Sequence, residues 1–128
     1  MGKVMRALGL MSGTSLDGID VALLDTDGLN HVARGPAMTI PYGPEMRQLL
    51  MSAIGDARAI TERRDRPGCL TAAEREVTEH HAAAVATFLS QHGIKRDGID
   101  VIGFHGQTVL HKPDQRLTIQ LGLGAALA

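Results

Sequence analysis

The chain has 128 residues, with 13 Lys and Arg against 14 Asp and Glu, for a formal net charge of −1. This length fits one domain with a modest core, and the balanced charge gives no reason to expect nucleic acid or a membrane surface as a partner. Aromatic residues make up 2% and Trp is missing. The core is therefore expected to consist of Leu, Ile, Val, Ala and Met, and platforms for stacking nucleic-acid bases are not expected.

Three strand patterns open the chain. Apolar runs over residues 5–11 and 19–25 predict two strands. Residues 29–40 predict a third, because turn-forming residues frame them on both sides, including the strong turn signal Asp27-Gly28. Strands joined by such short links form an antiparallel meander.

The link between the first two strands has the composition of a phosphate-binding turn. Its two glycines allow positive φ and close approach to the backbone. Its hydroxyl groups and bunched amides can hold an anion, while Asp17 and Asp20 suit Mg²⁺ held largely through water. The alternative is an ordinary hairpin turn, because Gly, Ser and Asp are common turn formers. The segment reads Ser12-Gly13-Thr14-Ser15-Leu16-Asp17-Gly18-Ile19-Asp20.

The next segment predicts a helix and a charged connector. Apolar residues recur at helical spacing over residues 45–60, and Pro44 suits a first helical turn. Residues 61–70 form a connector too short to separate two domains. It contains the only cysteine, Cys69, which excludes an internal disulfide and fits a reducing compartment. Its charged surroundings favour an inert thiol over a nucleophile.

A second helix is expected after the connector. Thr71 and Glu74 have the spacing of a capping box, in which both side chains satisfy free amides at a helix start. The pattern continues to about His92, with Gly93 as C-terminal cap. The adjacent pair His80-His81 points in directions about 100° apart, so the two cannot chelate one metal as an i, i+4 pair can. We expect one to pack against the sheet and the other to be solvated.

The last part of the chain predicts two more strands, at residues 100–104 and 117–121. A polar block, Gly103-Phe104-His105-Gly106-Gln107-Thr108, ends the first of them, where α/β proteins often place ligand groups. His105 could hydrogen-bond a sugar or a phosphate, and Gln107 can both donate to and accept from hydroxyls. The alternative is a histidine satisfied within a turn.

Two long segments, in this order, indicate a family. Residues 9–22 read Gly-Leu-Met-Ser-Gly-Thr-Ser-Leu-Asp-Gly-Ile-Asp-Val-Ala, and residues 102–113 read Ile-Gly-Phe-His-Gly-Gln-Thr-Val-Leu-His-Lys-Pro. Both are similar to signature blocks of the anhydro-N-acetylmuramic acid kinases. The resemblance extends from about Leu8 to the last residue and is weakest between Pro44 and Leu70.

The resemblance implies a fold. The expected class is α/β, a ribonuclease-H-like half-domain of the sugar kinase and actin-like ATPase superfamily. An antiparallel β-meander would be followed by helices and further strands, and two such lobes would enclose a cleft. Family members continue well beyond this chain, so Ala125 to Ala128 are expected to begin a helix that is cut off. Residues 1–128 would then be a partial N-terminal lobe whose C-terminal remainder is absent.

The resemblance also implies a reaction. Family members use ATP to open 1,6-anhydro-N-acetylmuramic acid hydrolytically and to phosphorylate O6, giving N-acetylmuramic acid 6-phosphate in peptidoglycan recycling. Water attacks the anomeric carbon, a carboxylate takes its proton, and O6 receives the γ-phosphoryl group. The family's general base lies in a later segment, beyond Ala128, so no catalytic residue is expected in this chain. The family's acidic residue after Gln-Ile-Gly is replaced here by Leu123, which offers no polar side chain.

By this resemblance, the first turn would bind ATP and the second block would line the sugar side of the cleft. Asp17 and Asp20 would belong to the Mg²⁺ shell, and His105, Gln107 and Thr108 would contact the sugar. The apolar members of the turn would contribute only main chain. The expected nucleotide-binding residues are Gly13, Thr14, Ser15, Leu16, Asp17, Gly18, Ile19 and Asp20.

The expected partner is therefore a small sugar, with neither nucleic acid nor membrane, and the complete protein could be a homodimer. The first six residues lack the apolar run of a signal peptide, and no run has the length of a membrane span. We expect a cytoplasmic protein whose 128 residues are inactive alone. The alternative is a non-catalytic, truncated lobe of nucleotide-binding type that acts only as a binding or assembly module. A generic actin-like ATPase is a third hypothesis.

Overall fold

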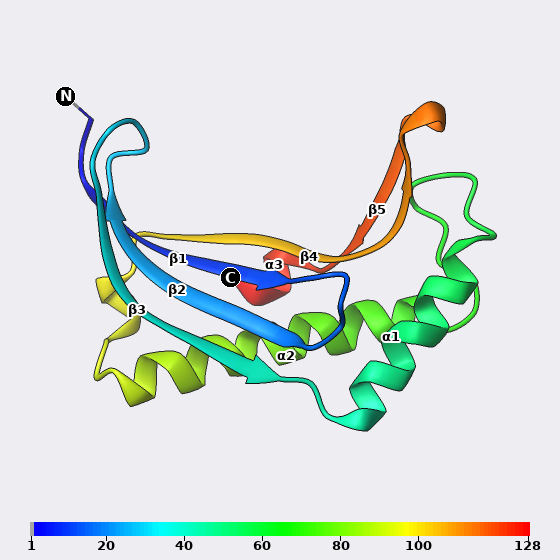
Figure 1. The fold of residues 1–128 in the computed structure, drawn as a ribbon, viewed down its shortest axis with the longest axis horizontal. Coiled ribbons are helices and arrows are strands. Elements are labelled where there is room, and N and C mark those ends of the chain that lie inside the picture. Colours follow the sequence, from blue (N-terminus) through cyan, green and yellow to red (C-terminus); the bar gives the residue numbers. More distant parts are fainter. Residues whose placement is uncertain (1) are drawn as a thin grey trace.

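The computed structural model describes residues 2–128, which form an open five-stranded sheet with the two long helices on one face (Figure 1). The first three strands are an antiparallel meander, as predicted. The fourth strand lies parallel to the first, and the fifth is antiparallel to the fourth. The strands, in the sheet order β3-β2-β1-β4-β5, are β1 (Met5–Ser12), β2 (Gly18–Thr26), β3 (Val32–Pro41), β4 (Val101–Lys112) and β5 (Leu117–Leu121).

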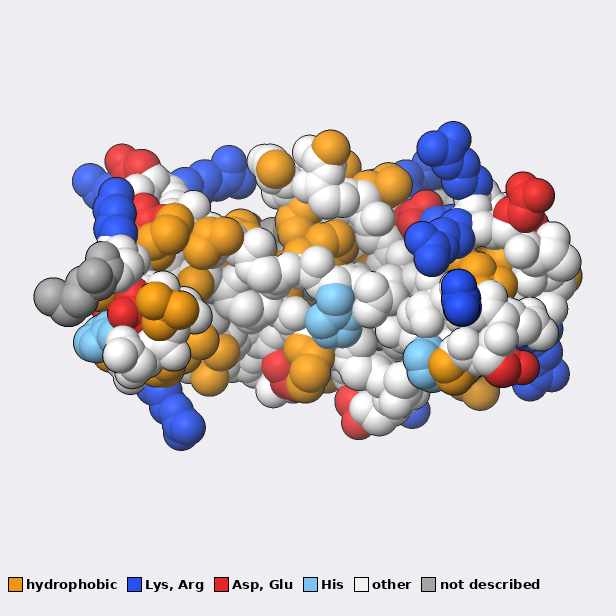
Figure 2. Space-filling view, turned by 90° about the horizontal axis from the view of Figure 1, so that it is seen from above, with side chains coloured by type: hydrophobic (Ala, Val, Ile, Leu, Met, Phe, Trp, Pro, Cys, Tyr) orange, Lys and Arg blue, Asp and Glu red, His pale blue; other side chains and the backbone are white. Residues whose placement is uncertain are grey.

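Alternation along β1 separates the two faces of the sheet. Leu8, Leu10 and Ser12 are buried toward the helices, whereas Gly9 and Met11 are exposed on the opposite face. We call this second surface the open face. Seen from above in Figure 2, its centre is mostly backbone and uncharged side chains, and Lys and Arg gather toward the two ends.

Two helices cover the other face and close the core. They are α1 (Pro44–Ala57) and α2 (Leu70–Gln91). Pro44 occupies the first helical position of α1, as predicted, because that position needs no backbone donor. The predicted extension of α1 to residue 60 is wrong: the helix ends at Ala57, and further turns bring Ile60 back into the core. Fully buried side chains from the sheet and both helices meet here, among them Leu8, Leu50, Val77 and Phe88, and Leu121 belongs to a second buried cluster.

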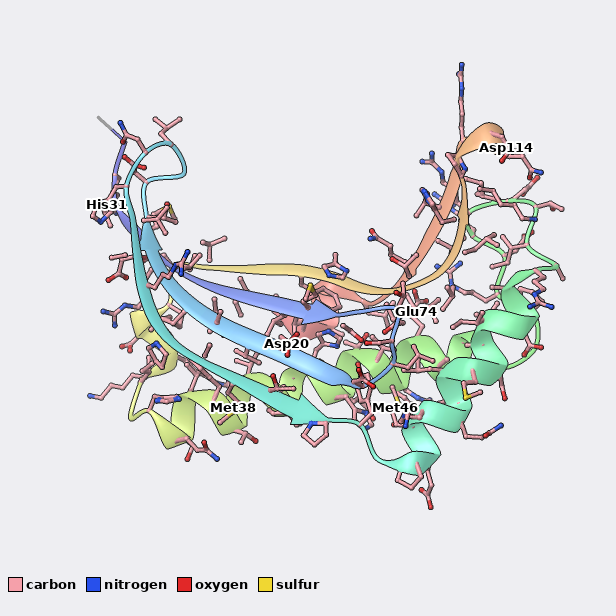
Figure 3. All side chains as sticks on the ribbon, viewed as in Figure 1. Asp20, His31, Met38, Met46, Glu74 and Asp114 are labelled. Atoms are coloured by element: carbon pink, nitrogen blue, oxygen red, sulfur yellow. The ribbon has the colours of Figure 1, made fainter. Side chains whose placement is uncertain are left out.

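The capping box predicted for α2 is wrong. The helix begins at Leu70 with Cys69 as its N-cap, and no side chain caps it, so Thr71 already lies within the first turn. Glu74 (Figure 3) instead extends toward the sheet, where its carboxylate accepts a hydrogen bond from the Gly122 amide at 3.1 Å. The same carboxylate pairs with Arg66 at 3.2 Å. The Glu74 carboxylate is therefore used in an ion pair and in a long-range hydrogen bond, and not in a capping box.

The C-terminal end of α2 agrees with the sequence prediction. Gly93 has φ +61°, and its amide donates to the Ser90 carbonyl, while the Ile94 amide donates to the Leu89 carbonyl at 2.9 Å. These two bonds form a Schellman motif, which needs the left-handed conformation that glycine adopts readily. The predicted glycine cap is confirmed.

Strand β4 is much longer than the predicted residues 100–104, because it continues to Lys112. The ladder with β1 pairs Leu10 with Phe104 and then Ser12 with Gln107, so β4 contains one extra residue, a β-bulge. Gly106 lies in this bulge with φ +73°. A β-carbon there would lie 1.9 Å from the Leu121 carbonyl oxygen, so only glycine lets the end of β5 approach β4 this closely.

The remaining elements are short. β5 has the predicted bounds, and α3 (Gly124–Leu127) follows it, where the sequence predicted a helical turn. Two single-turn 3₁₀ helices, η1 (Arg96–Gly98) and η2 (Pro113–Gln115), connect the other elements. Within residues 2–128, no helix has the length and apolar character needed to cross a membrane.

Candidate functional site

The β1–β2 loop directs its polar groups outward. The Leu16 amide donates to the Gly13 carbonyl at 3.2 Å and closes a β-turn. Thr14 and Ser15, at the tip of this turn, are exposed. Among the hydrogen bonds formed within residues 2–128, none satisfies the backbone amides of Thr14 and Ser15. The turn therefore presents two free amides and two hydroxyls to solvent.

Leu16 anchors this turn to the hydrophobic core. Its φ is +59°, a left-handed conformation that a bulky residue rarely adopts. Its side chain is only 7% exposed and belongs to the main core cluster. Such a conformation persists where the surroundings fix it, and here the buried side chain and the turn hydrogen bond do so. The loop is therefore anchored to the core through the Leu16 side chain.

The two glycines of the loop have different roles. A β-carbon on Gly18 would lie 2.3 Å from the Ile40 carbonyl oxygen, so this glycine is required by the close approach of β3. An added β-carbon on Gly13 would meet only the Ser15 hydroxyl oxygen, at 3.9 Å. The space beside Gly13 is therefore open to another molecule. Ile19 is buried. Like Leu16, it is an apolar member of the expected nucleotide-binding set.

The predicted magnesium ligands lie at the edge of the loop. Asp17 and Asp20 are both exposed, and the Thr39 hydroxyl donates to the Asp20 carboxylate at 2.6 Å. Asp20 pairs with Met11 and Thr39 across neighbouring strands, so it lies on the open face. In the part of the chain that the structure describes, His, Cys, Asp and Glu form no cluster of three or more that could hold a metal. Two carboxylates suit Mg²⁺ only if water and a ligand's oxygens complete its shell.

The second predicted block lies beside the loop but divides between two sides of the sheet. His105 is exposed on the open face of β4, next to Met11 of β1. Thr108 is partly buried and pairs with Gln120 of β5. Gln107 is fully buried on the helix side, because the bulge at Gly106 shifts the alternation by one residue. The parallel pairing of β1 and β4 thus brings His105 to the loop, whereas the Gln107 side chain points into the core.

A buried hydrogen-bond network lies beneath the loop. The Ser12 hydroxyl donates to the Gln107 side-chain carbonyl, and the Tyr42 hydroxyl lies 2.8 Å from the Ser12 oxygen. The Gln107 amide nitrogen donates to the carbonyls of Gly13 at 3.2 Å and of Thr108 at 3.3 Å. Burial raises the pKa of Tyr42, which its bond to Ser12 offsets in part. The Ser12 hydroxyl, expected among the anion-binding groups of the turn, instead lies in this network. Sequence reasoning missed Tyr42 as its partner, because only the fold brings the β3–α1 link against β1.

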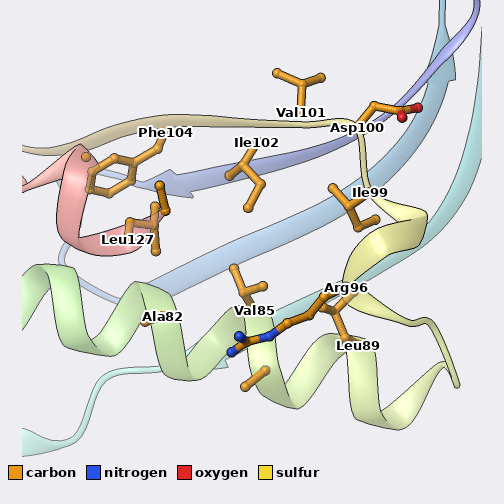
Figure 4. Close-up of a pocket in the computed structure, with 13 residues that line it drawn as sticks. Ala82, Val85, Leu89, Arg96, Ile99, Asp100, Val101, Ile102, Phe104 and Leu127 are labelled. Atoms are coloured by element: carbon orange, nitrogen blue, oxygen red, sulfur yellow. The ribbon is translucent and has the colours of Figure 1, made fainter.

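A groove on the helix side of the sheet was not predicted (Figure 4). It has a volume of about 650 Å³ and lies between α2, β4 and α3. Apolar side chains dominate its lining. Of its charged members, Arg96 extends along α2 toward Val85, whereas Asp100 lies apart from it, just before β4 (Figure 4). Val85, Leu89, Ile102, Phe104 and Leu127 form its apolar part. The predicted site residues do not line it, so the groove is separate from the loop.

The histidine pair divides between core and surface, as the sequence predicted. His81 is fully buried and its ring packs edge-on against Phe104, with centroids 4.9 Å apart, while His80 is partly exposed. Burial lowers the pKa of His81. Burial, together with the neighbouring Asp56 carboxylate, raises the pKa of Cys69, which favours the unreactive thiol.

The fold and the loop together define a class of protein. An antiparallel meander, a helical crossover and a fourth strand parallel to the first form a mixed α/β unit of the ribonuclease-H-like, or actin-like, half-domain type. The family model of the anhydro-N-acetylmuramic acid kinases matches residues 5–128. The chain belongs to this family.

Individual relatives agree with the family model. The chain is 57% identical over 128 residues to an anhydro-N-acetylmuramic acid kinase of Agrobacterium fabrum, covering 100% of this chain and 34% of the relative. It is 58% identical over 124 residues to one of Azorhizobium caulinodans, covering 97% of this chain and 33% of the relative. A relative of the same name from Brucella canis is 52% identical over 128 residues, covering 100% and 34%. The chain thus spans about a third of the length of the relatives it matches.

Proposed function

We propose that this chain is the nucleotide-phosphate-binding part of an ATP-dependent kinase acting on 1,6-anhydro-N-acetylmuramic acid. The observation that supports this most is the turn at Thr14 and Ser15, which presents free amides and hydroxyls on a backbone held from below. Fixed donors of this kind stabilise the negative charge of a phosphoryl group without reorganising during the reaction. The name shared by the relatives supports a kinase.

The roles of the residues follow from their positions. The Thr14 and Ser15 groups would donate to the terminal phosphate oxygens of ATP, with the main chain of the whole stretch from Gly13 to Asp20 shaping the pocket. Asp17 and Asp20 would orient the water shell of Mg²⁺, which supplies positive charge against the phosphates. His105, on the open face beside the loop, and Thr108 would contact the sugar. Such an enzyme would work in the cytoplasm, where Cys69 stays reduced.

The reaction needs a further group. Attack of water at the anomeric carbon breaks the bond between C1 and O6, and the water proton passes to a base. O6 then takes the γ-phosphoryl group of ATP, whose bond to the β-phosphate breaks with release of ADP. The family resemblance puts that base in a segment beyond Ala128. We therefore assign this chain the phosphate side of the reaction and part of the sugar side.

A chimera tests the proposal. This chain would replace the matching third of the Agrobacterium fabrum relative, with Thr14→Ala and Ser15→Ala introduced together. We expect the KM for ATP to rise at least about tenfold, because a hydrogen bond to a charged group contributes roughly 1.5–3 kcal/mol. Steady-state kinetics of sugar phosphorylation measure the effect. A KM within about twofold of the parent chimera would contradict the assignment of the loop.

The control for this test uses the same residue types elsewhere. Ser52→Ala on α1 and Thr87→Ala on α2 remove exposed hydroxyls outside the loop, and both should leave the KM for ATP unchanged. Melting curves of all variants establish that the fold is intact. A parent chimera that forms no sugar phosphate with ATP and Mg²⁺ would overturn the kinase proposal itself.

The alternative is a binding or assembly module without turnover. The apolar groove between α2 and β4 favours it, because open apolar surfaces of this kind often mark interaction sites. The two proposals differ in one result. Only the kinase proposal requires that the parent chimera convert the anhydro sugar to its 6-phosphate with ATP and Mg²⁺.

A further inference from the structure

The bulge in β4 determines which way Gln107 points. In a regular strand, Phe104 and Gln107 would face opposite sides of the sheet, because side chains alternate. The extra residue at Gly106 makes both face the helices, and Gln107 becomes fully buried. A buried side-chain amide must find partners for both its oxygen and its nitrogen. Gln107 finds them at Ser12, Gly13 and Thr108.

The donors and acceptors in this network have one consistent arrangement. Ser12 uses its only hydroxyl hydrogen toward the Gln107 carbonyl oxygen, so the Tyr42 hydroxyl must donate to Ser12. The Gln107 nitrogen then donates its hydrogens to the carbonyls of Gly13 and Thr108. Ser12, Gln107 and Tyr42 are 2%, 0% and 7% exposed, so water barely competes. We call these three residues the anchor network.

The anchor network joins the loop to three parts of the fold. Ser12 ends β1, Tyr42 lies in the link from β3 to α1, and Gln107 lies in β4. The Tyr42 backbone amide adds a second tie, because it donates to the Asp17 carbonyl at 2.9 Å. Fully satisfied buried polar networks fix a single arrangement of the elements they join. The loop is thereby held from both ends of its turn.

The hydrogen bond from Gln107 to the Gly13 carbonyl connects the anchor network to the exposed amides of Thr14 and Ser15. The Gly13 carbonyl accepts from both the Gln107 side chain and the Leu16 amide, so it points toward the core. With this carbonyl held inward, the following amides at Thr14 and Ser15 are left free at the surface. Loss of the network would let the peptide units of the turn rotate, and the two amides would no longer be fixed before a ligand arrives.

We propose that Ser12, Tyr42 and Gln107 are positioning residues that preset the Gly13–Leu16 turn for an anionic ligand. The identity of that anion, a nucleotide phosphate, rests on the proposed function, whereas the presetting of the turn does not. The proposal also replaces the predicted sugar contact of Gln107, because protein groups already occupy both polar atoms of its side chain. Its effect on a reaction would pass through Thr14 and Ser15.

The first measurement is independent of any enzyme activity. Tyr42→Phe and Gln107→Met each remove hydrogen bonds while keeping the side chain's approximate size, and Gln48→Met on the exposed side of α1 is the matched control. In this chain, we expect both anchor variants to shift the amide NMR signals of residues 13–16 and to speed hydrogen exchange at the Leu16 amide at least about tenfold. The control should do neither. An unchanged turn in Tyr42→Phe would overturn the proposal even if Gln107→Met failed to fold.

The second measurement uses the chimera and separates the two substrates. We expect both anchor variants to raise the KM for ATP at least about fivefold and to leave the KM for the sugar within about twofold. A variant that only loosens the fold would lower the melting temperature without this split. A rise confined to the sugar KM of Gln107→Met would instead restore the sugar contact and overturn the positioning role. If the turn moves as expected but the parent chimera makes no product, the proposed function fails and the anchor network stands.

Discussion

His81 is a buried histidine with an incomplete set of partners. Its Nδ1 hydrogen is donated to the Val77 carbonyl at 2.7 Å, while Nε2 has no hydrogen-bond partner among residues 2–128. A charged imidazolium would leave a buried donor unsatisfied, and the nearby His80 and His105 would repel it. Burial accordingly lowers the pKa of His81 from its usual 6.5, and the neutral ring is the form that fits the fold.

This burial predicts an acid-dependent loss of stability. In the unfolded chain, His81 has a pKa near 6.5 and binds a proton more readily than in the native state. Stability from the neutral ring is therefore complete above about pH 6.5 and is lost as the pH falls from there toward the lower native pKa. Urea unfolding at pH 8.0 and 5.5 should show a smaller pH-dependent loss in His81→Met than in the parent chain. Equal losses in the parent and in His81→Met would contradict the prediction.

At the scale of elements, sequence patterns predicted the meander, both long helices and the glycine end of α2. These features depend on local periodicity and turn residues, which a sequence displays directly. The N-terminal cap of α2 could not be predicted, because the Glu74 carboxylate binds Arg66 and the Gly122 amide. Gly122 is distant from Glu74 in sequence. The direction of Gln107 was missed for a related reason: a glycine in a strand does not reveal whether it forms a bulge.

The bulge itself makes a stability prediction. Gly106→Ala would place a β-carbon 1.9 Å from the Leu121 carbonyl oxygen at a backbone with φ +73°, so β5 would have to move. We expect a destabilisation of roughly 2 kcal/mol or more, measured by chemical denaturation. Gly55→Ala is the control, and we expect it to raise the free energy of unfolding. Gly55 is exposed in α1 with open space around it, and alanine in a helix interior is more stable than glycine by about 0.5–1 kcal/mol. A loss at Gly106 smaller than about 0.5 kcal/mol would argue against a glycine-dependent bulge.

For the whole molecule, the β1–β2 loop lies at one end of the sheet, His105 lies on the open face, and the helix side carries an apolar groove. The loop could be predicted from the sequence as a link of phosphate-binding composition, because its residue types and order are local. The groove depends on how α2, β4 and α3 meet, so no single segment displays it. The relatives are about three times as long as this chain, and the sugar reaction needs a base that the family resemblance places outside it.

Because we assign the phosphate site but not the base to this chain, we expect it to bind Mg-ADP without turnover. Phosphoryl transfer needs both a phosphate site and a positioned base, and we assign only the first to this chain. Titration of the 128-residue chain with Mg-ADP should therefore shift the amide signals of Thr14 and Ser15. The Thr14→Ala, Ser15→Ala double variant should weaken this response. The same chain, incubated with ATP, Mg²⁺ and the anhydro sugar, should release no sugar phosphate detectable by ³¹P NMR, whereas the chimera should. Product from the chain alone would mean that a base lies within residues 1–128, with His105 and Asp20 on the open face as the first residues to substitute.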